Sequence, residues 1–182
     1  RSRQGHGHDP AGFNFKTGDA LYATYECRTT DQLVALSNTG RSYSVSVAGL
    51  PGARGDGAPM TTMVELEPGS RLVHFLAGPA DTDVILATQG GQGFISKLVG
   101  LQARNRAGKQ FMTLDAGDQP IVLKALQPGS GALAVLTGTG RLLVFGLDEV
   151  KVLANGGRGV ALVTLEGPKD GLLDVSPVAD AG

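Results

Sequence analysis

Three segments of this chain present the same series of features in the same order. Each opens with an apolar, β-rich run, turns at a glycine, continues as a second strand, passes through a loop that holds a cation beside glycine, and ends in another apolar strand. The turn glycines are Gly40, Gly91 and Gly140, which stand 51 and 49 residues apart. A repeat of about 40 to 50 residues is typical of the four-stranded blades of propellers. The period therefore predicts a propeller-sized β unit that recurs along the chain.

The residues within each unit predict short strands joined by tight turns. Polar and apolar side chains alternate in SYSVSV (residues 42–47), in MVEL (residues 63–66) and, less strictly, in RLLVFGL (residues 141–147). This pattern is expected of sheets with one packed face. The stretches NTGR, QGGQG and GTGR predict hairpin turns in which glycine supplies a positive φ. A short helical turn is expected at DEVKVL (residues 148–153), and no stretch has a sustained helical period. The sequence therefore predicts an all-β fold.

Length and composition bound the domain organisation. The 182 residues, with 28 glycines, nine prolines and no tryptophan, predict one domain (residues 1–182) made of many short elements. The first 26 residues follow the second half of the repeated pattern without its opening strand. We therefore expect about three complete repeats plus a partial N-terminal blade. The expected blades are residues 1–32 (partial), 33–82, 83–131 and 132–182.

Charge and cysteine content narrow the function classes. The formal net charge is −1, so a polyanion such as DNA could be bound only through local clusters of cations. Cys27 is the single cysteine, which excludes a disulfide framework or a thiolate metal site and suits a reducing compartment. Nothing resembles a secretory leader, and apolar runs such as PIVLKAL are too short to span a membrane. We expect a cytoplasmic protein without a cofactor.

Particular stretches resemble a known family. GHDPAGFNFKTGD, TGRSYSVSVAGLPGARGDG and LQARNRAGK are similar to the C-terminal domain of the A subunit of bacterial DNA topoisomerase IV, which is related to the matching domain of the gyrase A subunit. The likeness covers essentially all of the chain, and ARNRAGK is its most specific part. The resemblance implies a β-pinwheel, in which four-stranded, propeller-like blades exchange a strand with a neighbour and DNA bends around a basic perimeter.

The family also offers a comparison with gyrase. Gyrase A domains that wrap DNA strongly carry a box that reads Gln-Arg-Arg-Gly-Gly-Lys-Gly, and this chain has no such heptad. The nearest partial matches are ARNRAGK (residues 103–109) and NGGRG (residues 155–159). The departure favours topoisomerase IV over gyrase and argues against gyrase-like wrapping.

Cations on glycine-rich loops are the candidate DNA contacts. Arginine and lysine on such loops can approach phosphates closely, and these contacts position DNA without reading its sequence. If successive blades place them along one curved rim, the rim would bend DNA. The candidates are Lys16, Arg41, Arg54, Arg104, Arg106, Lys109, Arg141 and Arg158. The alternative for any one loop is a solvated surface, and Arg41 and Arg141 are equally consistent with solvent-facing turn residues.

Catalytic and metal sites find little support in the sequence. HGHD (residues 6–9) places two histidines two apart, but no thiolate accompanies them, so we expect no metal site. Tyr22, Tyr25 and Tyr43 lie in apparent strands and are expected to be packing residues rather than nucleophiles. The glycine runs GGQG and TGTG lack a following Lys-Ser/Thr pair, which argues against nucleotide binding. No catalytic residue is expected.

The resemblance and the repeated cationic loops together predict an accessory DNA-binding and DNA-bending domain. The family implies that the parent protein is an ATP-hydrolysing type IIA topoisomerase that unlinks chromosomes and relaxes supercoils, with its cleavage machinery outside these residues. Implied partners are double-stranded DNA, the ATPase B subunit and a second copy of the A subunit, at the bacterial nucleoid and without a membrane. The alternative is a β-propeller module that binds an acidic protein partner at the same rim.

Overall fold

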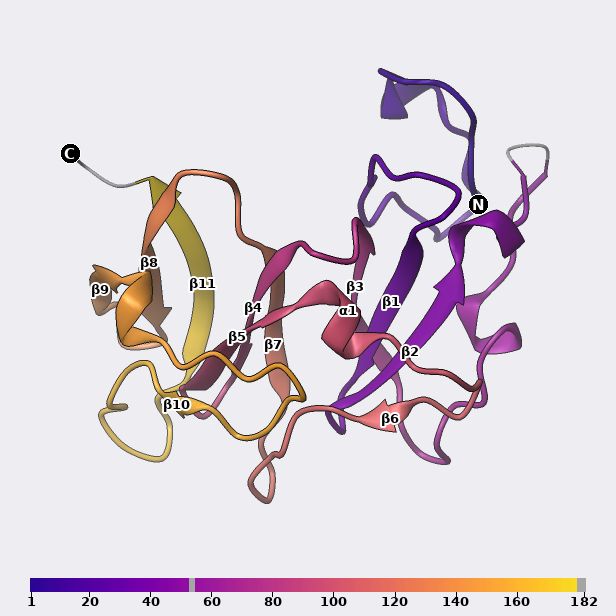
Figure 1. Cartoon of the computed structure of the whole chain (residues 1–182). Coiled ribbons are helices and arrows are strands. Elements are labelled where there is room, and N and C mark those ends of the chain that lie inside the picture. The colour runs from indigo at the N-terminus through magenta and orange to yellow at the C-terminus, as the bar shows by residue number, and fades with distance from the viewer. Residues whose placement is uncertain (53–54, 180–182) are drawn as a thin grey trace.

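The computed structural model describes residues 1–52 and 55–179, whose strands form three antiparallel sheets arranged in series (Figure 1). The first sheet has, in spatial order, β3 (Leu72–Gly78), β1 (Gln32–Ser37), β2 (Arg41–Ser46) and β6 (Lys109–Gln110). The second has β10 (Val160–Ala161), β5 (Gln92–Lys97), β4 (Asp83–Thr88) and β7 (Pro120–Ala125). The third has β11 (Leu172–Ala179), β8 (Ser130–Thr137) and β9 (Leu142–Gly146). The predicted all-β, propeller-like fold is confirmed.

The central hairpin of each sheet turns at one of the three predicted glycines. Gly40, Gly91 and Gly140 have φ values of 82°, 88° and 83°, which glycine adopts without a steric penalty. A short helical turn follows each hairpin, and these turns are η2 (Val47–Gly49), α1 (Leu98–Leu101) and η4 (Leu147–Glu149). The repeated sequence pattern thus gives a repeated hairpin and helical turn, including the turn expected near residue 148.

Two short strands are exchanged between neighbouring sheets. β6 follows the hairpin of the second sheet along the chain, yet it pairs with β2 of the first sheet, with Ser42 opposite Lys109. β10 follows the hairpin of the third sheet and pairs with β5 of the second, with Gly93 opposite Val160. Each of these sheets is therefore completed by a strand from the next unit, which is the exchange that the family resemblance implied.

The segments before and after the first hairpin contain fewer strands than expected. The strand predicted at residues 63–66 is wrong. These residues follow η3 (Met60–Thr62) as irregular chain, and the amide of Glu65 donates to Arg106 O (2.8 Å) instead of joining a ladder. Residues 1–31 contain η1 (Pro10–Gly12) and a bridge from Ser2 to Gly52. Tyr22 and Tyr25 of the first segment contact Phe75 of β3, and the amide of Glu67 in the second donates to Tyr43 Oη of β2.

The strand β4 lies between the two halves of the hydrophobic core. Val84 and Leu86 belong to the cluster that packs the first sheet against the second, whereas Ile85 and Ala87 belong to the cluster that packs the second against the third. All four side chains are fully buried. Because side chains alternate across a strand, β4 supplies both clusters at once, which explains its unbroken apolar sequence.

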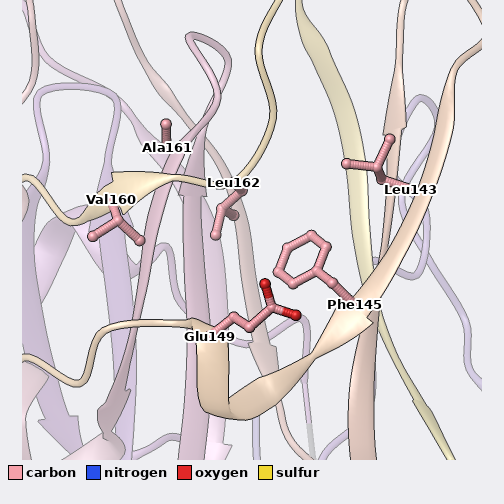
Figure 2. Close-up of a pocket in the computed structure, with 6 residues that line it drawn as sticks. All are labelled: Leu143, Phe145, Glu149, Val160, Ala161 and Leu162. Atoms are coloured by element: carbon pink, nitrogen blue, oxygen red, sulfur yellow. The ribbon is translucent and has the colours of Figure 1, made fainter.

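The outer edge of β9 has no partner strand among the described residues. Leu142 and Val144 on β9 are 64% and 60% exposed. Leu143 and Phe145, on the opposite face, line an open pocket with residues 160–162 and η4 (Figure 2). The third sheet therefore differs from the other two in lacking an exchanged strand in the part of the chain that the structure covers.

Truncation of the β4 core should destabilise the whole domain. We expect Ile85→Ala to lower the free energy of unfolding by about 2–5 kcal/mol, because it leaves a cavity between the second and third sheets. Urea denaturation would measure the loss. Leu142→Ala is the control, because its exposed side chain should contribute within about 0.5 kcal/mol. Equal losses for the two variants would contradict the assignment of this core.

Candidate nucleic-acid interface

The cationic stretch ARNRAGK forms a loop that lies along the edge of β2. This first exchange loop (residues 103–109) connects α1 to β6. Ser44 Oγ donates to Ala103 O (3.0 Å) and accepts from Ala103 N (2.9 Å). At mid-loop, the carbonyl oxygen of Arg106 accepts the hydrogen bond from Glu65 N. The loop is therefore held at both its start and its middle by the first sheet and the segment beside it.

Glycine is required where the first exchange loop enters β6. Gly108 has φ 66°, and a Cβ atom there would overlap Ser42 O and lie 2.8 Å from Tyr43 Cδ1. The second exchange loop (residues 153–159), which leads into β10, meets the same constraint at Gly159, where a Cβ atom would overlap the backbone of β5. Glycine recurs in these loops because the backbone must come this close to the neighbouring sheet.

Arg41 and Arg106 hold the loop in place with their guanidinium groups. Arg41 donates from Nε to Ala107 O (2.7 Å) and from Nη2 to Gly108 O (3.1 Å). Arg106 donates from Nη2 and Nε to the carbonyl oxygens of residues 62–63 (3.0 and 3.1 Å). Each of these side chains therefore has two donors engaged by the protein itself, and each positions the loop.

Arg104 and Lys109 face an open groove beside the loop. Its lining also includes Gln32, Ser44 and Gln102, and none of the described residues that line it is acidic. The groove has a volume of about 430 Å³. Neither Arg104 nor Lys109 forms an ion pair with a described carboxylate. Lys109 Nζ also lies 5.8 Å from the centroid of the Phe111 ring. No described carboxylate neutralises either cation, so both can meet an external anion.

Three further candidates each contact a carboxylate. The pairs are Lys16 with Asp56 (2.8 Å), Arg141 with Glu166 (3.4 Å) and Arg158 with Asp115 (2.8 Å). The hydrogen bond with Asp56 raises the pKa of Lys16, and the same bond lowers the pKa of Asp56. Arg54, the remaining candidate, lies outside the described residues.

The backbone of the second exchange loop adjoins the chain that follows β6. Thr113 N donates to Gly157 O (3.0 Å), and Gly157 N donates to Phe111 O (2.8 Å). Figure 1 shows β6 and β10 on the same side of the three sheets. The first exchange loop, β6 and the second exchange loop thus form a continuous band of chain along the sheets.

The tyrosines and histidines do not gather into a site. Tyr43 is fully buried in β2, but Tyr22 and Tyr25 lie outside the strands where they were expected, and Tyr25 donates to Phe75 O (2.6 Å). Burial raises the pKa of Tyr25 to about 12.

Within residues 1–52 and 55–179 no three His, Cys, Asp or Glu side chains are grouped to hold a metal ion. No helix in the same ranges is long and apolar enough to cross a membrane.

Known proteins share both the sequence and the fold. A family model described as DNA gyrase C-terminal domain, beta-propeller, matches residues 82–119 and 132–179. The A subunit of DNA topoisomerase 4 from Neisseria gonorrhoeae is 36% identical over 174 residues, and that from Escherichia coli K12 is 35% identical over 156 residues. These matches cover 91% and 86% of the chain. The solved C-terminal domain of E. coli ParC matches 98% of this chain and 75% of its own, with 32% identity and a TM-score of 0.88. The chain belongs to the family of C-terminal domains of the topoisomerase IV A subunit.

The chain spans about a fifth of the length of the curated topoisomerase 4 relatives that it matches, 22% and 21% for the two named. The family assignment agrees with the absence of the gyrase heptad from the sequence.

The acidic partners of the paired cations were not among the residues predicted from the sequence. Asp115 ends the triplet Thr-Leu-Asp after β6, and Glu166 ends the triplet Thr-Leu-Glu after β10. The recurrence of an acid at this position of two units is a signal that could have found them. The exact cation that each acid contacts could not have been read from the spacing.

The steric requirement at Gly108 can be separated from its backbone conformation. Gly129 also has a positive φ of 84°, but a Cβ atom there would meet nothing within 4 Å. We expect Gly108→Ala to cost about 1–3 kcal/mol more unfolding free energy than Gly129→Ala, because of the crowding against β2. Chemical denaturation of both variants measures this difference. Similar costs would show that β6 does not require the close approach.

Proposed function

We propose that this domain binds duplex DNA through backbone phosphates, as the accessory DNA-binding and DNA-bending domain of a topoisomerase IV A subunit. The observation that carries the proposal is the pair Arg104 and Lys109, which lines an acid-free groove on a loop held rigidly against the first sheet. Membership of the topoisomerase IV family supports it. A loop whose backbone is already held by hydrogen bonds loses little backbone freedom on binding, so it suits phosphate contacts.

Contacts of this kind are independent of base sequence. Arginine and lysine bound to phosphates position a duplex without reading it. Bending a site of about 20–30 base pairs by 40–90° costs roughly 1–6 kcal/mol, which several charge-assisted contacts can offset. With two cations in the groove and a net charge of −1, binding is moderate and strongly salt-dependent.

The proposed role in the parent protein is to hold DNA near the cleaved segment. The domain bends the duplex that flanks the cleaved segment, or it presents the DNA segment that is transported through the break. In either way it influences which DNA crossings are unlinked or relaxed. In this proposal the parent is a type IIA, ATP-hydrolysing topoisomerase at the bacterial nucleoid, with an ATPase B subunit and a second copy of the A subunit. The chemistry of strand cleavage belongs to other parts of that protein.

A protein-interaction module is the alternative function. The pairing of Lys16, Arg141 and Arg158 with acids and the near-neutral net charge favour it, because a polyanion gains less from such a surface. Such a module would have no steep salt dependence with DNA, so a single titration separates the two functions.

The test is DNA binding by the variant Arg104→Gln/Lys109→Gln. Neither side chain donates a hydrogen bond that holds the loop in the structure, so the fold should persist. Loss of two phosphate contacts should make the slope of log affinity against log salt shallower by about 1.8. Fluorescence anisotropy with a labelled duplex measures it.

The matched control is Arg71→Gln/Lys97→Gln, which removes the same charge. Arg71 lies beside β3, on the edge of the first sheet opposite β6, and Lys97 pairs with Asp83 at the far end of the hairpin from β10. No binding by the native domain at low salt, or equal slopes for both double variants, would refute the proposed function.

A further inference from the structure

Acidic residues at equivalent positions of two units each contact an arginine, and one of these two arginines lies in the band formed by the exchange loops. Asp115 lies three residues beyond Met112, which follows β6, and Glu166 lies three residues beyond Val163, which follows β10. Asp115 pairs with Arg158 of the second exchange loop. Glu166 pairs with Arg141, which directly precedes β9.

The pair of Arg158 with Asp115 is placed by the backbone around it. The hydrogen bonds that join Gly157 to Phe111 and Thr113 fix the second exchange loop against the chain that leaves β6. The two charged groups are then 2.8 Å apart, with side chains 56% and 54% exposed. Exposed ion pairs of this kind are weak, so a phosphate can compete with the carboxylate for the guanidinium group.

The first and second exchange loops therefore present different charge to a ligand. Arg104 and Lys109 of the first loop have no described carboxylate partner and line an acid-free groove. Arg158 of the second loop is neutralised, and a phosphate that replaces Asp115 still meets the negative charge of that carboxylate nearby. Like charges close together oppose binding, most strongly at low salt.

We propose that Asp115 masks Arg158 and thereby limits how far along the exchange loops a duplex is held, with Glu166 acting in the same way on Arg141. This inference rests on the proposed DNA-binding function. The first exchange loop is the main contact, and the acids keep the second and third sheets from extending the bound length of DNA. Affinity and bound length are set by these acids as well as by the cations.

The experiment compares Asp115→Asn with the native chain in duplex binding between about 50 and 200 mM salt. One additional phosphate contact makes the slope of log affinity against log salt steeper by about 0.9. Over this range the affinity of the variant should therefore fall roughly three- to fourfold more than the affinity of the native chain. At the lowest salt the variant should bind more tightly than the native chain.

Asp83→Asn is the matched control for the loss of one negative charge. Asp83 pairs with Lys97 at 2.8 Å, and its side chain is 53% exposed, so the change in charge and exposure is similar but lies away from the exchange loops. We expect its slope to equal the native slope. The double variant Asp115→Asn/Arg158→Gln should lose the steeper slope and the tighter binding at low salt, because the unmasked guanidinium group is absent. Glu166→Gln provides a second test of the same effect at Arg141.

The outcomes separate this inference from the function on which it rests. If Asp115→Asn and Glu166→Gln both keep the native slope while Arg104→Gln/Lys109→Gln has the shallower slope, the mask is refuted and DNA binding stands. The mask is also refuted if Asp83→Asn steepens the salt slope as much as Asp115→Asn does, or if Asp115→Asn/Arg158→Gln keeps the steeper slope. If the native chain fails to bind DNA, both the mask and the proposed function are refuted.

Discussion

The close approach of an exchanged strand to the edge of its neighbour's hairpin is the constraint on which the architecture depends. β6 has only two residues, too few for ladder hydrogen bonds alone to hold it in place. Gly108 lets the backbone approach β2 because it has no side chain, and Arg41 donates two hydrogen bonds to carbonyl groups of the loop. The same arrangement of glycine against a hairpin strand recurs at Gly159. Because each exchanged strand belongs to the next unit, this contact joins successive units in addition to the shared core.

The same contact divides the cations into two kinds. Arg41 and Arg106 donate to backbone carbonyl groups of the loop and of residues 62–63, so their guanidinium groups are engaged within the protein. Arg104 and Lys109 project from the loop that these bonds fix. The segment ARNRAGK therefore contains one arginine that positions the loop and two cations available to a ligand, so a count of its positive charges overstates its capacity for phosphate.

Much of the fold could be predicted from the sequence because its determinants are local. The turn glycines Gly40, Gly91 and Gly140 specify their own backbone conformation, and alternation of side chains specifies the hairpin strands. The exchange partners could not be derived from the residues alone, because two-residue strands carry no periodic pattern, and only the family resemblance implied them. The roles of the cations depend on contacts such as Arg41 with Ala107, 66 residues apart, and Arg158 with Asp115. Composition contains no information about such pairings, so the candidate site was predicted as a set of residues but not as an arrangement.

The open edge of β9 has a practical consequence for the behaviour of this polypeptide in solution. A strand edge with free backbone groups and apolar side chains is a template for pairing with another molecule, and natural sheets usually protect such edges with charge or proline. Leu142 and Val144 provide neither protection. The β9 edge therefore offers a second molecule a place to pair, and a lysine on its solvent-facing side would oppose that pairing without disturbing the hydrophobic clusters beneath.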